Sequence, residues 1–213
     1  MSVVTRIVVM AKAPSPGFAK TRLIPALGPH GAASLASRML QHTLDTALGA
    51  AIGPVELCAA PDPADPTWQH VAVPRGVVWS AQGTGDLGAR MARAAQRACS
   101  QAARVLLIGT DCPALGATQL QGAAAALDDH DATLLPTFDG GYALLGLRVV
   151  HASMFESMPW STPVVARETL RRTEQLGWRV KRLATLRDID EPSDLQWLPP
   201  SWQADLKAAT DAG

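Results

Sequence analysis

Short apolar runs rich in β-branched residues recur along the chain, and each is followed by a loop or by a segment of helical character. Runs of this kind, bounded by Gly, Pro or polar residues, are typical of strands buried inside a parallel sheet. They predict strands over residues 6–11, 55–60, 77–80, 104–109, 132–136, 141–147 and 178–183. The run over residues 104–109 is the most apolar of them.

The segments between these runs have helical character. Helices are predicted over residues 31–48, from residues 83–86 to about residue 103, over residues 118–127 and over residues 163–176. Gly177 ends the last of them. Alternating strands and helices imply a Rossmann-like α/β fold with a mostly parallel central sheet and helices on both faces. No internal repeat or linker divides the chain. We therefore expect one domain over residues 1–198, followed by a C-terminal tail, residues 199–213, whose last residues fray.

Composition narrows the class of protein. Of the 213 residues 47% are hydrophobic, enough for a full core, and 19 Lys and Arg balance 19 Asp and Glu. With no net field to attract nucleic acid or a membrane surface, neither partner is expected. The 3 cysteines form no CxxC pair, and no apolar run resembles a signal sequence or a membrane span, so a reduced, cytoplasmic protein is expected.

The loop after the first predicted strand combines prolines and glycine with positive charge. It reads Lys12-Ala-Pro14-Ser-Pro-Gly17-Phe-Ala-Lys20-Thr-Arg22-Leu. Backbone amides of such a loop can approach a phosphate closely while Lys and Arg side chains neutralise it. The spacing is not that of a P-loop. A solvated basic connection is the alternative, but ligands of α/β sheets bind at the carboxyl ends of strands, where this loop lies.

Acidic residues follow three other predicted strands. Asp111 comes directly after the most apolar strand, where it suits Mg²⁺ or Mn²⁺ binding, although a turn or helix-capping role is the alternative. Asp188 and Asp190 are two residues apart and project to the same side of an extended chain, so they repel unless a cation offsets them. Asp139 begins an Asp-Gly-Gly turn that is either a hairpin or a low wall beside a ligand.

Together these segments resemble the DUF2064 family, also described as rSAM/selenodomain-associated transferases. That family is itself similar to the GT-A nucleotide-diphospho-sugar transferases and to the 2-phospholactate guanylyltransferase group. The resemblance extends from Val8 to Leu198, and the matching stretches are KAPSPGFAKTRL, GDLGARM, LIGTDCPAL, PTFDGGYALLGL, WSTPVV and DIDEPSDL. It implies a GT-A fold and a metal-dependent transferase acting on a nucleotide-sugar or nucleoside triphosphate and a small-molecule acceptor.

The resemblance also implies a site. Lys20 and Asp111 are the expected catalytic residues. Nucleotide and phosphate groups would be bound by Lys12, Pro14, Gly17, Lys20, Arg22, Asp86 and Arg90. The acceptor side would be formed by Asp139, Gly140, Gly141, Tyr142, Trp160, Ser161 and Thr162. Mg²⁺ or Mn²⁺ would be held by Asp111 with Asp188 or Asp190.

Three functions remain open at this point. A nucleotide-diphospho-sugar glycosyltransferase is the leading hypothesis. The run Asp111-Cys112-Pro113 lacks the second acid of the Asp-x-Asp pattern common in glycosyltransferases of this fold, so nucleotidyl transfer to a phosphorylated acceptor is the alternative. A non-catalytic nucleotide-binding module is the third, and the retained acids disfavour it. A Rossmann oxidoreductase is disfavoured because no GxGxxG follows the first strand. Cys112 is expected to be a buried thiol beneath the loop, and the five histidines receive no role.

Overall fold

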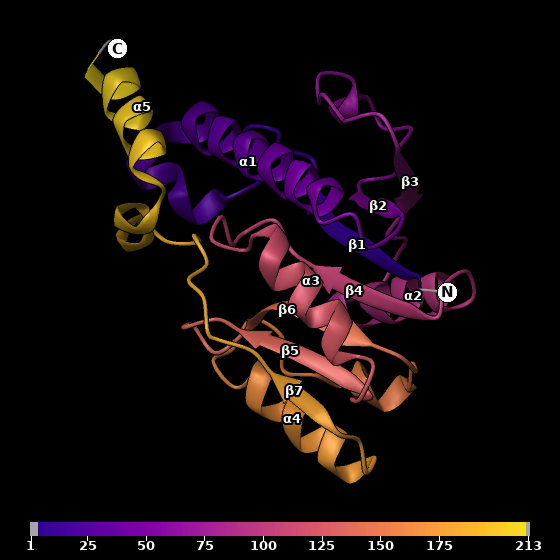
Figure 1. Cartoon of the computed structure of the whole chain (residues 1–213). Helices are drawn as coiled ribbons and strands as arrows, with labels where there is room; N and C mark the ends of the chain where they lie inside the picture. The colour runs from indigo at the N-terminus through magenta and orange to yellow at the C-terminus, as the bar shows by residue number, and fades with distance from the viewer. Residues whose placement is uncertain (1–3, 212–213) are drawn as a thin grey trace.

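Seven strands form one sheet in the order β3-β2-β1-β4-β6-β5-β7 in the computed structural model, which describes residues 4–211 (Figure 1). Every neighbouring pair is parallel except the two that include β6, which confirms the mostly parallel sheet. β6 runs antiparallel because a short loop joins it to β5, and a parallel crossover needs a dozen or more residues. The strands are β1 Thr5–Lys12, β2 Val55–Ala60, β3 Val77–Ala81, β4 Arg104–Ile108, β5 Ala132–Pro136, β6 Tyr142–Leu147 and β7 Val180–Arg182.

The first four helices follow the predicted order, with shifted ends, and a fifth, α5, forms in the segment predicted to be a tail. They are α1 Ile24–Gly49, α2 Leu87–Cys99, α3 Ala117–Ala126, α4 Val165–Gln175 and α5 Pro200–Asp211, with short 3-10 turns at η1 Thr21–Leu23, η2 Pro66–Trp68, η3 Ala152–Met154 and η4 Pro192–Trp197. α1 starts before the predicted residue 31 but is broken at Gly28, whose φ is 67°, next to Pro29. Pro cannot continue the hydrogen bonding of a preceding helical turn, so the regular helix resumes after it. None of the described helices combines the length and apolarity that crossing a bilayer requires.

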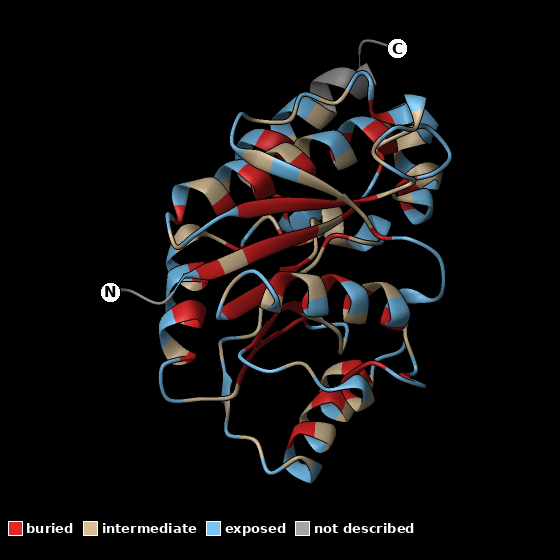
Figure 2. Ribbon diagram, turned by 90° about the vertical axis from the view of Figure 1, so that its right-hand side faces the viewer, coloured by how far each residue is buried: buried red, intermediate tan, exposed pale blue. Residues whose placement is uncertain are grey.

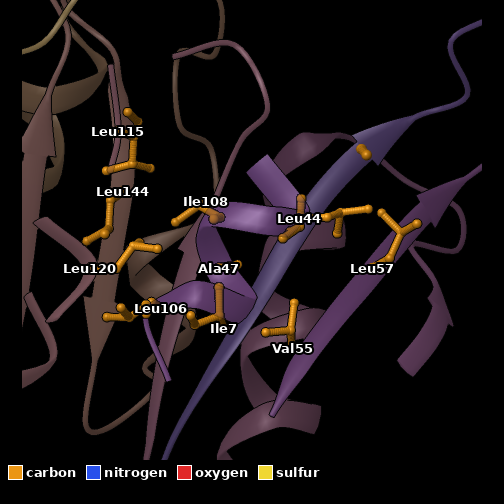
Figure 3. Packing of buried hydrophobic residues seen from close by; sticks show 14 of the residues in the cluster. Ile7, Leu44, Ala47, Val55, Leu57, Leu106, Ile108, Leu115, Leu120 and Leu144 are labelled. Carbon is orange, nitrogen blue, oxygen red and sulfur yellow. The ribbon is translucent and has the colours of Figure 1, made fainter. Parts of the chain in front are cut away.

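The core lies on both faces of the sheet, and side chains of β1 alternate between them. Ile7 and Val9 pack with Leu44 of α1 and Leu120 of α3 on one face (Figure 3). Val8 faces the other side, where α2 and α4 supply the covering residues, including Met91, Ala94, Ala95, Ala98, Ala166 and Leu170. Figure 2 shows the inner strands of the sheet buried between helices whose outer surfaces are exposed, while the edge strands β3 and β7 are only partly buried. This alternation is the two-residue period of a strand with both faces covered.

The connections reverse direction between β1 and β4. From β1 the chain moves outward through β2 to β3, and it then returns across α2 to place β4 on the other side of β1. Adjacent parallel strands whose connections leave in opposite directions create a crevice at their carboxyl ends, which is where ligands of open α/β sheets bind. The loops that begin at Ala13 and Gly109 both start at this edge.

The predicted tail contains α5, which packs beside the first half of α1 (Figure 1). Trp202 of α5 joins a buried cluster with Leu35 and Met39 of α1 and with Ile189. Its ring also stacks beneath the guanidinium of Arg38, 4.5 Å from the ring centroid. The segment that precedes α5 carries Ile189, so this packing fixes the position of the acidic residues on either side of it. The last two residues, expected to fray, lie outside the described part of the chain.

Candidate active site

A cleft of about 710 Å³ opens at the carboxyl ends of β1 and β4. Its lining includes residues from all six motifs singled out in the sequence. The lining includes Lys12, Phe18, Lys20, Thr21, Arg22, Gln82, Asp86, Leu87, Arg90, Met91, Thr110, Asp111, Asp139, Gly141, Tyr142, Trp160, Ser161, Thr162, Val165 and Asp190. The fold therefore gathers, at the crevice between β1 and β4, residues as far apart in the chain as Lys12 and Asp190.

Lys20 joins the two carboxylates at the floor of the cleft. Its Nζ atom lies 2.6 Å from Oδ1 of Asp111 and 2.6 Å from Oδ1 of Asp190, and it donates a further hydrogen bond of 2.6 Å to the backbone oxygen of Ile189. The side chain is only 7% exposed. Burial alone would lower the pKa of Lys20, but the charges of Asp111 and Asp190 outweigh it and the pKa is raised, so the ammonium form is firmly held.

The backbone at Lys20 is held in an unusual conformation. Its φ of 51° and ψ of 42° lie in the left-handed region, which costs a non-glycine residue free energy. The loop before it is folded by hydrogen bonds from the backbone N–H groups of Phe18 and Ala19 to the oxygen of Ser15, and Gly17 turns the chain with a φ of 77°. The strained residue is thus the one whose side chain contacts both carboxylates. Strained backbone conformations of this kind cluster at functional sites.

Asp111 and Asp190 are the acids that converge. Their Oδ1 atoms each lie 2.6 Å from the same nitrogen, so they are no further apart than twice that distance. A backbone hydrogen bond of 2.8 Å from the N–H of Ile189 to the oxygen of Asp111 ties the two segments together. Two carboxylate oxygens that meet around one cation fit a hard divalent ion, which takes oxygen ligands and completes its shell with water and substrate phosphates. Within the part of the chain that the structure describes, no third acidic, His or Cys side chain completes a metal-binding cluster.

Asp188 is placed differently from the other two predicted metal ligands. It is half-buried and is not among the residues that line the cleft. Burial, followed by the negative charge of Asp139, raises the pKa of Asp188 to about 6, and Asp190 and Asp194 add to this effect. Asp139 itself accepts hydrogen bonds from the hydroxyl of Thr137 and the backbone N–H of Gly141. Asp188 therefore lies near Asp139, while Asp190 contacts Lys20.

Cationic side chains border the carboxylates. Arg22 is 60% exposed, and its Nη1 atom lies 3.8 Å from Oδ2 of Asp190, too far for a strong ion pair. Lys12 ends β1 at the same edge and is exposed. On the facing wall, Asp86 caps α2 by accepting a 2.8 Å hydrogen bond from the N–H of Ala89, and Arg90 donates from Nε to the oxygen of Gly85. The wall thus presents a helix N-terminus to the cleft, which favours an anion there.

Two aromatic side chains, those of Tyr142 and Trp160, also line the cleft. The rings of Tyr142 and Trp160 meet edge to face, with centroids 6.5 Å apart. Burial raises the pKa of the Tyr142 hydroxyl, which therefore stays protonated, and this hydroxyl points to the sulfur of Met91 at 3.9 Å. Ser161 and Thr162 continue the wall, and the Thr162 hydroxyl donates to the oxygen of Pro159 at 2.6 Å. Aromatic surface beside a few polar groups is typical of a pocket for a small organic ligand.

Some predicted site residues do not line the cleft. Pro14, Gly17, Gly140 and Asp188 are not among the lining residues. Gly140 has a φ of 91°, and a Cβ atom at this position would be 2.1 Å from the backbone oxygen of Pro163. It lets the Asp-Gly-Gly turn pack against the segment after Trp160, and a 2.9 Å hydrogen bond from the N–H of Ala166 to the Gly140 oxygen joins them.

Several lining residues were not expected from the sequence. Gln82 is buried, and its Nε2 atom donates to the backbone oxygens of Ala11 and Cys58, both at 3.0 Å. It follows β3, so the rule that selects strand ends could have found it. No comparable feature of the sequence selects the other lining residues Phe18, Met91 and Val165. Cys112 is buried as expected, and burial raises the pKa of its thiol to about 11.

Known structures share this architecture. A candidate nucleotide-diphospho-sugar transferase from Desulfovibrio desulfuricans superposes with a TM-score of 0.84 at 28% identity, covering 98% of this chain and 95% of that one. A cytidylyltransferase from Leptospira borgpetersenii gives 0.55 at 15% identity, covering 99% and 94%. A Mycobacterium tuberculosis protein in complex with manganese gives 0.52 at 18% identity, covering 92% and 97%. No curated protein matches the sequence.

These relationships confirm the GT-A fold, that of the nucleotide-diphospho-sugar transferases, and identify the protein as an enzyme of the transferase class. The sequence model of a family described as uncharacterized proteins conserved in bacteria matches residues 43–162, more than half of the chain. That range contains Asp86, Asp111, Tyr142 and Trp160, which all line the cleft. The chain belongs to the DUF2064 family.

Proposed function

We propose that this protein transfers a sugar from a nucleotide-diphospho-sugar to a small acceptor. The observation that carries the proposal is the meeting of Asp111, Asp190 and Lys20 in a cleft that Tyr142 and Trp160 also line. The carboxylates suit a diphosphate with a divalent cation, and the aromatic side chains suit a sugar or an acceptor of similar size. The resemblance to the D. desulfuricans protein supports the same type of donor.

Each side chain has a distinct part in this proposal. Asp111 and Asp190 would hold Mg²⁺ or Mn²⁺, which would offset the charge that builds on the leaving diphosphate. Arg22 and Lys12, both exposed at the cleft, would bind the phosphate oxygens, and a fork of donors such as that of Arg22 matches two of them at once. Tyr142, Trp160 and Thr162 would orient the acceptor, whose hydroxyl attacks the anomeric carbon as the nucleoside diphosphate departs.

Nucleotidyl transfer is the second candidate, and one observation favours it. The second carboxylate of the pair is Asp190, which follows β7, whereas the position of the second acid of an Asp-x-Asp run that starts at Asp111 is occupied by Pro113. The cytidylyltransferase fold relative is consistent with this reading. In that reaction an acceptor phosphate attacks the α-phosphorus of a nucleoside triphosphate and releases pyrophosphate.

Stabilisation of the protein by ligands tests both candidate functions. The melting temperature is measured with nucleoside triphosphates and nucleotide-sugars, each with Mg²⁺, Mn²⁺ or EDTA. A ligand at about 100 times its dissociation constant adds about 2.7 kcal/mol to the free energy of unfolding. A metal-dependent rise with one nucleotide-sugar, followed by release of nucleoside diphosphate, supports glycosyl transfer. A rise with a triphosphate alone, followed by release of pyrophosphate, supports nucleotidyl transfer. The absence of any rise contradicts both.

A further inference from the structure

We propose that Lys20 is the built-in counter-cation of the Asp111–Asp190 pair, and that a divalent ion binds only by displacing its ammonium group. Lys20 would then keep the affinity for free metal low and make tight metal binding depend on the donor nucleotide. The inference rests on the proposed function in one respect only, the assignment of these two carboxylates to a divalent cation.

The geometry places Lys20 where a bound ion would have to be. Its nitrogen is equidistant from the two Oδ1 atoms, at 2.6 Å from each, and a third oxygen, that of Ile189, completes the contacts at 2.6 Å. The ammonium group donates hydrogen bonds to Asp190 and to the oxygen of Ile189, and it forms an ion pair with Asp111. The nitrogen therefore sits among three oxygens, as a hard cation would.

Because Lys20 is buried, it is unfavourable for a divalent ion to share the two carboxylates with its ammonium group. The Lys20 side chain is 7% exposed, so water screens its charge poorly, and a divalent ion between the same two oxygens would meet a positive charge at contact distance. A surface lysine could swing away at little cost. Lys20 cannot leave without losing three short contacts, so the free ion has to compensate for their loss.

The donor nucleotide would supply a new anionic partner for the displaced ammonium group, which a free metal ion does not provide. A displaced ammonium group needs another anion, and the exposed cations Lys12 and Arg22 border the same cleft and would bring a phosphate group to it. The unbranched four-carbon stem of lysine lets the group move between neighbouring anions. Donor phosphate would thus take over Lys20 while the two carboxylates take the metal, and each ligand would favour the binding of the other.

The inference is tested by titrating Mn²⁺ alone, without nucleotide, into the wild type and Lys20→Gln in a calorimeter. We expect Mn²⁺ to bind Lys20→Gln about tenfold more tightly than the wild type. Arg22→Gln is the matched control, because it removes one positive charge 3.8 Å from Asp190 but not from between the carboxylates, and its affinity should change little. Adding Asp190→Asn to Lys20→Gln should abolish the gain.

Equal or weaker Mn²⁺ binding by Lys20→Gln would overturn the inference, as would an equal gain in Arg22→Gln. If Lys20→Gln unfolds in EDTA, Mn²⁺ should restore its folding, since the ion replaces the missing charge; failure to do so also overturns the inference. The proposed function fails on a different readout, the absence of any melting shift of the wild type with nucleotide donors, so the two outcomes are distinguishable.

Discussion

Gly88, in the first turn of α2, lies directly against the indole of Trp160: a Cβ atom on Gly88 would be 2.9 Å from Nε1 of that ring and 2.4 Å from the backbone oxygen of Phe155. Nε1 is buried and has no hydrogen-bond partner within the described residues. The absence of a side chain at Gly88 therefore lets the loop before Trp160 close onto α2. This contact sets the position of Trp160 in the cleft relative to the start of α2, where Asp86 lies.

Gly88→Ala is expected to destabilise the protein by about 1–3 kcal/mol, because a methyl group has no room between α2 and the Phe155 oxygen. It should also weaken acceptor use by displacing Trp160. Urea denaturation measures the first effect and acceptor KM the second. Gly122→Ala in α3 is the control. That site is open and helical, so alanine should be neutral or add up to about 1 kcal/mol, and a similar loss in both variants would contradict this account.

The sequence predicted the sheet and the elements that border the site, because apolar runs and strand ends are local signals. Residues 104–108 form β4 as expected, and the loops after β1 and β4 meet at the cleft. The orientation of β6 and the break in α1 at Gly28 were not predicted, because they depend on loop length and on backbone geometry. The sequence also assigned Lys20 to phosphate and Asp190 to metal. Their ion pair spans 170 positions, and only tertiary packing of η4 and α5 brings them together.

The ion-pair network around Glu56 provides a second prediction. Glu56 is 2% exposed and contacts Arg6, Arg97 and the hydroxyl of Ser80. Glu56→Ala leaves two guanidinium groups without their shared carboxylate, and removing one partner of a buried pair costs about 3–5 kcal/mol. Asp205→Ala is the control, because Asp205 and Arg38 form an exposed pair, for which about 0–1 kcal/mol is expected. The midpoints of denaturant unfolding compare the stability of the two variants. An equal loss of stability in both would refute the role assigned to Glu56.

Asp188 makes stability depend on pH in a definite direction. Its pKa is raised to about 6 in the folded protein, first by burial and then by Asp139, whereas the unfolded value is about 3.9. The folded state therefore binds the proton more tightly, and stability falls as pH rises from about 4 to about 6 and is constant above that. Asp188→Asn should match the wild type at pH 4 and exceed it at pH 8.

After allowance for the half-exposed side chain, the gain of Asp188→Asn at pH 8 is about 1 kcal/mol, or roughly 2–4 °C in melting temperature. The measurement is a melting curve in EDTA at several pH values, so that no metal contributes. Asp129→Asn, on an exposed carboxylate, controls for the change in net charge. A gain in Asp188→Asn that is the same at pH 4 and pH 8 would rule out the titration.

Arg22 is expected to bind diphosphate even when no nucleoside is attached. It is exposed at the cleft, and its nearest carboxylate oxygen, Oδ2 of Asp190, is 3.8 Å away, so most of its hydrogen-bonding capacity is available to a ligand. Arg22→Gln should weaken the binding of inorganic pyrophosphate with Mg²⁺ about tenfold, the loss expected for a hydrogen bond to a charged group. Titration calorimetry measures the dissociation constant. Arg167→Gln removes the same charge from the exposed face of α4, away from the lining of the cleft, and should leave the constant unchanged. If both variants lose affinity equally, pyrophosphate is responding to the overall charge of the protein, and Arg22 has no specific part in holding it.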